Sequence, residues 1–141
     1  MDYSNIIDQY LEKPYWVVDI LPKQVPKGSR GQYFRVEEYF RTESRMAKLS
    51  EKFANVLLKL NCYDDIDVGI AEGEWTLNPA PALLHEWLCH RRPVYVLLKG
   101  ADAMIVADRD DTYMTIYNPD DDTLSILRQI ASSEGLFLWK P

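Results

Sequence analysis

Residues 103–112, Ala-Met-Ile-Val-Ala-Asp-Arg-Asp-Asp-Thr, combine residue types that could carry out chemistry. An apolar, strand-like run ends in Asp108, and Asp110 follows two residues later. Carboxylates at the end of a strand can hold Mg²⁺ and attack a phosphorus atom. The spacing therefore allows two interpretations. One is a Mg²⁺-dependent phosphohydrolase that uses Asp108 and Asp110, and the other is the acidic tip of a hairpin.

Four apolar residues followed by Asp-x-Asp-x-Thr resemble the first motif of haloacid-dehalogenase-like phosphatases. The resemblance implies that Asp108 is the nucleophile and Mg²⁺ ligand, and that Asp110 is the general acid. The chain then departs from that family, because "TYMTIYN" alternates like a strand where the family has a loop and a helix. The family's later Ser/Thr, Lys and acidic motifs are also missing. We therefore interpret Arg109-Asp110-Asp111 as a turn, and we assign no catalytic residue and no cofactor.

The segment "HEWLCH" at 85–90 is a near match to the His-Glu-x-x-His signature of zinc hydrolases, with Cys89 at the position of the second histidine. His85 and Cys89 would share one helix face. A metal site would still need a third ligand, which Cys62 or an aspartate could in principle supply, and a second shell. We assign no metal site and interpret His85 as a surface residue.

The formal net charge is −6, and the acidic excess lies in residues 61–141. This balance argues against nucleic-acid binding. It does so even though "KGSRGQ" at 27–32 resembles the Gly-x-x-Gly loop with which KH domains clamp a nucleic-acid backbone. A basic protein partner would suit the acidic half better.

Charged residues gather in two acidic loops and on one face of an expected helix. The solvated interpretation treats them as ordinary surface charge. The binding interpretation treats them as a docking site for a protein of opposite charge, or for a second copy of the chain in a homodimer. The candidate binding residues are Asp64 and Asp65, Asp108, Asp110 and Asp111, and the basic stripe Arg41, Arg45, Lys48 and Lys52.

Hydrophobic periodicity and turn residues predict the elements that would position these side chains. Helices are expected from a Ser4 cap to before Pro14, over 32–42, where the aromatic residues leave a strand possible, and over the stripe from Met46 to Leu60, which Asn61 ends. Two more helices are expected to open at Asn78-Pro79 and at Asn118-Pro119, where each asparagine caps the helix. Strands are expected over 15–20, 65–71, 94–99, 103–108, 112–118 and 136–139, and "WTL" at 75–77 is a further short candidate. Short connections make the last three long strands a meander. The expected fold class is α+β: a mixed, largely antiparallel sheet with helices packed on it, in a single domain of residues 1–141.

Cysteine usage and hydropathy favour a soluble, cytoplasmic protein. Cys62 and Cys89 lack paired spacing, the N-terminus lacks a basic and apolar leader, and "VYVLL" is too short to cross a bilayer. The segments "PYWVVDILPKQVP", "DDTYMTIYNP" and "GLFLWKP" are similar to a group of small uncharacterised bacterial proteins, and the resemblance implies a complete single-domain protein.

We expect a non-enzymatic cytoplasmic binding protein that uses acidic and aromatic surface, with an inhibitor or immunity-type protein as one concrete version. The phosphohydrolase that uses Asp108 and Asp110 is the first alternative. A domain that binds a small ligand in an aromatic pocket is the second.

Overall fold

A computed structural model describes residues 3–28, 32–70, 73–90, 93–108 and 110–141. Over these residues the chain forms five helices and seven strands. The helices are α1 (Ser4–Leu11), α2 (Gln32–Phe40), α3 (Glu43–Asn61), α4 (Pro81–Cys89) and α5 (Asp121–Ser133). The strands are β1 (Tyr15–Asp19), β2 (Ile66–Gly69), β3 (Thr76–Leu77), β4 (Val94–Leu98), β5 (Ala103–Ala107), β6 (Tyr113–Tyr117) and β7 (Phe137–Trp139).

The strands form one sheet in the order β3-β2-β4-β5-β6-β1-β7, and each neighbouring pair is antiparallel. This arrangement confirms the expected α+β class and the meander of β4, β5 and β6. The sequence did not predict that β1, from the start of the chain, lies between β6 and β7. That placement matters for function because it puts three strands with aromatic residues side by side.

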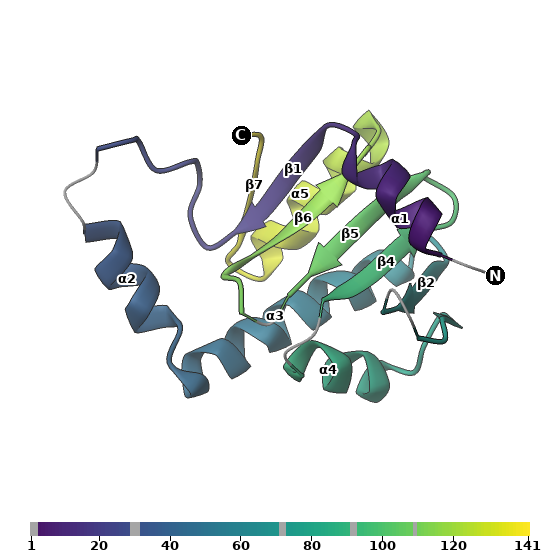
Figure 1. Cartoon of the computed structure of the whole chain (residues 1–141), viewed down its shortest axis with the longest axis horizontal. Helices are drawn as coiled ribbons and strands as arrows, with labels where there is room; N and C mark the ends of the chain where they lie inside the picture. The colour runs from purple at the N-terminus through teal and green to yellow at the C-terminus, as the bar shows by residue number, and fades with distance from the viewer. Residues whose placement is uncertain (1–2, 29–31, 71–72, 91–92, 109) are drawn as a thin grey trace.

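Helices α3, α4 and α5 cover one face of the sheet and form the main core with it (Figure 1). The stripe predicted for residues 43–61 is buried here, with Leu57 at 0% exposure. Every second residue of the strands points into this core, including Val18 of β1 and Ile116 of β6. The other residues of those strands therefore face the opposite side of the sheet.

Helix α1 covers only part of that opposite face. Ile7 packs with Leu97 and Met104 in a second, smaller apolar cluster. Two phenols tie α1 to the sheet region: Tyr3 donates to Asp67 at 2.8 Å and Tyr10 donates to Asp102 at 2.6 Å. The part of the face over β6, β1 and β7 lies beyond α1 (Figure 1).

Helix α2 stands apart from the sheet, at the left of Figure 1, and none of its residues is buried. Phe34 and Tyr39 are among its exposed residues. The sequence predicted this helix, but its amphipathic pattern does not say which surface it should cover.

Three expected capping residues have other roles. Tyr3, not Ser4, precedes the first turn of α1, and no side chain caps it. Asn78 and Asn118 have positive φ, 46° and 61°, in the left-handed region that asparagine adopts more readily than most other non-glycine residues. The helices begin further on, at Pro81 and Asp121.

In the part of the chain that the structure describes, no helix has the length and apolar character needed to cross a membrane.

Candidate functional site

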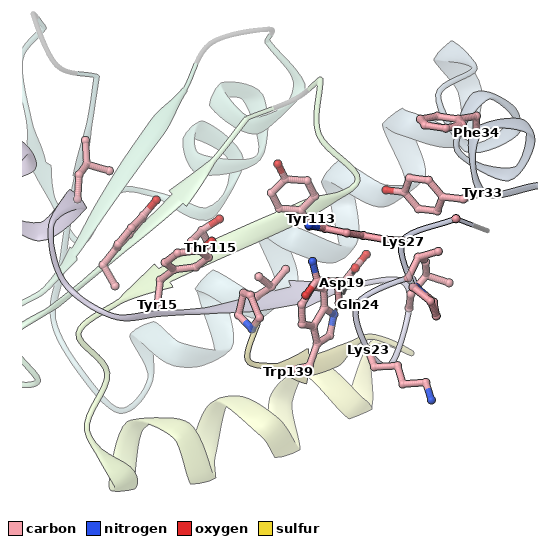
Figure 2. Close-up of a pocket in the computed structure, with 18 residues that line it drawn as sticks. Tyr15, Asp19, Lys23, Gln24, Lys27, Tyr33, Phe34, Tyr113, Thr115 and Trp139 are labelled. Carbon is pink, nitrogen blue, oxygen red and sulfur yellow. Dashed lines mark hydrogen bonds between the residues drawn. The ribbon is translucent and has the colours of Figure 1, made fainter. Parts of the chain in front are cut away.

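A groove of about 630 Å³ lies on the part of the sheet that α1 leaves open. Strands β1, β6 and β7 form its floor, and the segment 21–28 and the start of α2 line its other side (Figure 2). We call it the aromatic groove, after the six rings that line it: Tyr15, Tyr33, Phe34, Tyr113, Tyr117 and Trp139.

Strand alternation and register explain why these rings meet. Residues 15, 17 and 19 of β1 face away from the main core, and antiparallel pairing sets them opposite residues 117, 115 and 113 of β6. Trp139 of β7 lies on the other side of β1, opposite Val17. The floor is therefore one continuous surface of three strands, with aromatic residues at both ends.

The rings remain accessible to solvent. Tyr15 and Tyr117 contact each other with ring centroids 5.5 Å apart, yet Tyr15 is 42% exposed and Tyr113 is 37% exposed. Phe34, on the α2 side, is 69% exposed. Apolar rings that gather on one open surface are typical of binding sites.

Asp19 is a carboxylate in the floor of this aromatic surface, and only 8% of the residue is exposed. Trp139 donates its indole N–H to Asp19 at 3.3 Å. Burial raises the pKa of Asp19, while hydrogen bonds from the backbone of Leu21 and Ile20 and from Trp139 oppose that rise. The floor of the groove therefore contains a largely desolvated carboxylate.

Helix α2 brings a second acid to the same end of the groove. Tyr33 donates its phenol to Glu37 at 3.0 Å, and burial, with help from Glu37, raises the pKa of Tyr33 to about 12. Glu37 in turn acts on Asp19 across the groove and raises its pKa. Arg41 lies 3.7 Å from the other oxygen of Glu37, in an ion pair on the helix surface.

The acidic turn that follows β5 lies near this end of the groove. Asp108 is half-buried and accepts a hydrogen bond from the backbone of Asp110 at 3.1 Å, so its carboxylate stabilises the turn. Burial and the charge of Asp108 raise the pKa of the half-buried Asp111, and Arg41 lowers it. The structure thus brings together Asp108, Asp110 and Asp111 and the first residue of the basic stripe. Arg109 lies outside the described residues.

Asp64 and Asp65 lie at the other end of the sheet, near the start of β5. Asp64 accepts the backbone N–H of Gly100 at 2.8 Å, and Asp65 accepts the amide of Asn78 at 2.9 Å. These contacts stabilise loops. The two residues do not join the acids of the aromatic groove.

The residues of the basic stripe have different surroundings. The Arg45 guanidinium lies over the Tyr39 ring, 3.8 Å from its centroid, and donates to Thr42. Lys48 is exposed on α3. Lys52 is also exposed and helps to lower the pKa of Glu134, near the end of α5.

The sulfur of Cys89 lies 3.9 Å from Nε2 of His85, as expected from their spacing on α4. Cys89 is half-exposed. Among the described residues, no group of three or more His, Cys, Asp or Glu side chains is placed to hold a metal ion. The Gly-x-x-Gly loop resembling that of KH domains lies partly outside the described residues.

The sequence suggested an aromatic surface or pocket but did not identify the residues of the aromatic groove, although one signal for them is present. Tyr113, Thr115 and Tyr117 alternate with Met114 and Ile116, so one face of β6 is polar and aromatic and the other is apolar. Alternation shows that such a face exists. It does not show that β1 and β7 extend it.

Comparisons with known proteins found no match to this chain among family models, curated proteins or solved structures. The function is therefore inferred from the geometry of the aromatic groove.

Proposed function

We propose that this protein is a non-enzymatic binding protein and that the aromatic groove binds a protein partner. One observation carries the proposal: aromatic rings from three neighbouring strands and from α2 line one open surface and stay accessible. Aromatic side chains contribute a large share of the binding energy at protein interfaces, because they bury much area at a small loss of conformational entropy. An inhibitor or immunity-type role would fit a protein of this kind.

The charge of the molecule supports a basic partner. The net charge is −6, and Asp19, Glu37 and Asp111 lie at or near one end of the groove. A negative surface attracts a basic protein over distances comparable to the Debye length, about 10 Å at moderate salt. Association should therefore be faster at low ionic strength.

Photo-cross-linking in the native cells tests the proposal. A benzophenone amino acid replaces Phe34, which lines the groove, or Tyr63, which is 72% exposed but lies outside it. We expect a discrete protein adduct from position 34, none from position 63, and loss of the adduct when Tyr113→Ala is added. The absence of an adduct at position 34, or equal adducts at both positions, would contradict the proposal. A cross-linked product of twice the chain's own mass would show that the partner is a second copy of the chain.

The volume of the groove favours a small ligand as the second candidate. At about 630 Å³ it lies within the range of about 300–1,000 Å³ typical of ligand pockets. A small ligand would leave position 34 without a protein adduct, and a metabolite would co-purify with the wild-type chain but not with Tyr113→Ala.

A further inference from the structure

We infer that the acidic end of the aromatic groove receives an arginine side chain of the protein partner. The acidic end is defined by Asp19, Tyr33 and Tyr113, which line the groove, together with Glu37 and Asp111, whose charges act on them. The inference rests on the proposed function, because it names the chemical group that the bound partner presents.

Aromatic rings line this end of the groove on two sides. Tyr113 of β6 stands opposite Asp19 of β1 in the register. Tyr33 reaches toward it from α2, with its phenol directed at the Tyr113 ring across the groove (Figure 2). A guanidinium group stacks on ring faces and can donate several hydrogen bonds at once, which a lysine amine does less well.

The charges at this end are unbalanced in favour of a cation. Asp19, Glu37 and Asp111 are three carboxylates, and the charge of Glu37 acts on both of the others. Arg41, just after α2, offsets part of this negative charge: it forms an ion pair with Glu37 at 3.7 Å and lowers the pKa of Asp111 and of Tyr113. A guanidinium inside the groove would reduce the repulsion among the acids.

Burial of one acid strengthens the expected interaction. Asp19 is almost completely removed from water, and its known side-chain partner, the Trp139 indole, is a neutral donor at 3.3 Å. Charge-assisted hydrogen bonds are about twice as strong as neutral ones, and they gain further where water is excluded. Asp19 is therefore the residue on which an arginine should depend most.

Two lysines also line the groove, on the side opposite the strands, and their positive charge could repel an incoming arginine. Lys23 and Lys27 come from the segment 21–28 and line the groove. In Figure 2, Lys23 points away from the aromatic rings, whereas Lys27 extends toward Tyr113. Lys27 should therefore oppose an incoming cation, so removal of its charge should strengthen binding.

Three blocked peptides, Gly-Gly-X-Gly-Gly with arginine, lysine or citrulline at X, test the inference on the full chain. Citrulline keeps the shape of arginine but carries no charge. By NMR titration, we expect the arginine peptide to shift the Trp139 indole N–H and the amides of Asp19 and Tyr113. The citrulline peptide should bind about tenfold more weakly than the arginine peptide. The affinity of the lysine peptide should lie between those two. Equal affinity for arginine and citrulline would overturn the inference.

Variants assign the effect to the acidic end. Asp19→Asn should weaken binding of the arginine peptide by about tenfold, and Lys27→Gln should strengthen it a few-fold. Glu37→Gln, on a helix without buried residues, gives a second acid variant if Asp19→Asn does not fold. Asp122→Asn, at an exposed position on α5, removes the same charge elsewhere and should change nothing. Equal losses from Asp122→Asn and Glu37→Gln would show a general charge effect and overturn the assignment.

The two proposals fail in different ways. If the arginine and citrulline peptides bind equally while the protein adduct at position 34 persists, the arginine assignment is wrong and the binding function stands. If neither a peptide shift nor an adduct is found, both proposals are wrong.

Discussion

At the scale of single residues, Gly69 leaves room for the Trp75 ring to pack closely against β2. A Cβ atom on Gly69 would lie 2.7 Å from the Trp75 ring, and that ring stacks on Tyr3 with centroids 4.2 Å apart. Gly69→Ala should therefore displace the indole and lower the free energy of unfolding by about 1–3 kcal/mol. Urea denaturation measures this loss, and Trp fluorescence should change with it.

A double-mutant cycle checks the cause. In the Trp75→Ala background the added methyl group has room, so Gly69→Ala should cost much less there than in the wild type. An equal cost in both backgrounds would show that the indole is not responsible.

Asp19 should make stability depend on pH in an unusual direction. Burial raises its pKa above the ordinary value of 3.8, so the folded chain binds this proton at a higher pH than the unfolded chain does. The contribution of Asp19 to the free energy of unfolding should therefore increase as the pH falls through the folded-state pKa, and it should be lost as the pH rises.

Asp19→Asn removes this contribution. Relative to the variant, the wild type should be more stable at about pH 4 than at about pH 7, as measured by urea denaturation at both values. A difference between the two proteins that does not change with pH would contradict the assigned pKa direction.

At the scale of elements, the start of α5 depends on one side chain. Asp120 accepts the backbone N–H of Thr123 at 2.7 Å, and hydrogen bonds from the side chain and the backbone of Thr123 lower its pKa. Asp120→Ala should cost about 1 kcal/mol, whereas Asp120→Asn should keep the cap and cost little at neutral pH. Because the folded-state pKa is lowered, the stability that Asp120 provides is present above 3.8 and is lost as the pH falls through the folded-state pKa.

Acid titration of the three proteins separates charge from capping. The wild type should lose more stability than Asp120→Asn as the pH falls below about 4. If Asp120→Ala and Asp120→Asn are equally stable at neutral pH, the capping hydrogen bond does not stabilise the helix.

Helices and strands were predictable where a local sequence pattern determines them. The contacts between segments far apart in the sequence were less predictable. The period of Met46, Phe53 and Leu57 predicted α3 and its buried face. The left-handed Gly135, with φ of 73°, follows α5 as expected, because glycine adopts that conformation without strain. The aromatic groove instead depends on the pairing of Asp19 with Tyr113, far apart in sequence. Such a register follows from the packing of the whole sheet, which no local pattern contains.

At the scale of the whole molecule, two apolar clusters of unequal size lie on the two faces of one sheet. The larger one joins α3, α4 and α5 to the strands, and the smaller one holds α1 through Ile7. The eight-residue α1 is too short to be a stable helix by itself, so its order depends on this contact. The two faces should therefore respond differently to the same kind of truncation.

Leu57→Ala and Ile7→Ala give a matched test of that difference. Leu57 is 0% exposed and Ile7 is 3% exposed, so each substitution removes a buried aliphatic side chain. Leu57→Ala should lower the global free energy of unfolding by about 2–5 kcal/mol. Ile7→Ala should mainly release α1, because the larger cluster does not contain Ile7.

Native-state hydrogen exchange with mass spectrometry distinguishes local from global opening. In Ile7→Ala, amides of α1 should exchange much faster while those of α3, β5 and β6 keep most of their protection. In Leu57→Ala, protection should fall throughout the sheet and α3. If Ile7→Ala lowers protection in α3 as much as Leu57→Ala does, the two faces unfold as one unit. If they open separately, release of α1 would uncover Tyr95 and expose more of Tyr117, which already lines the groove, because both pack against the smaller cluster.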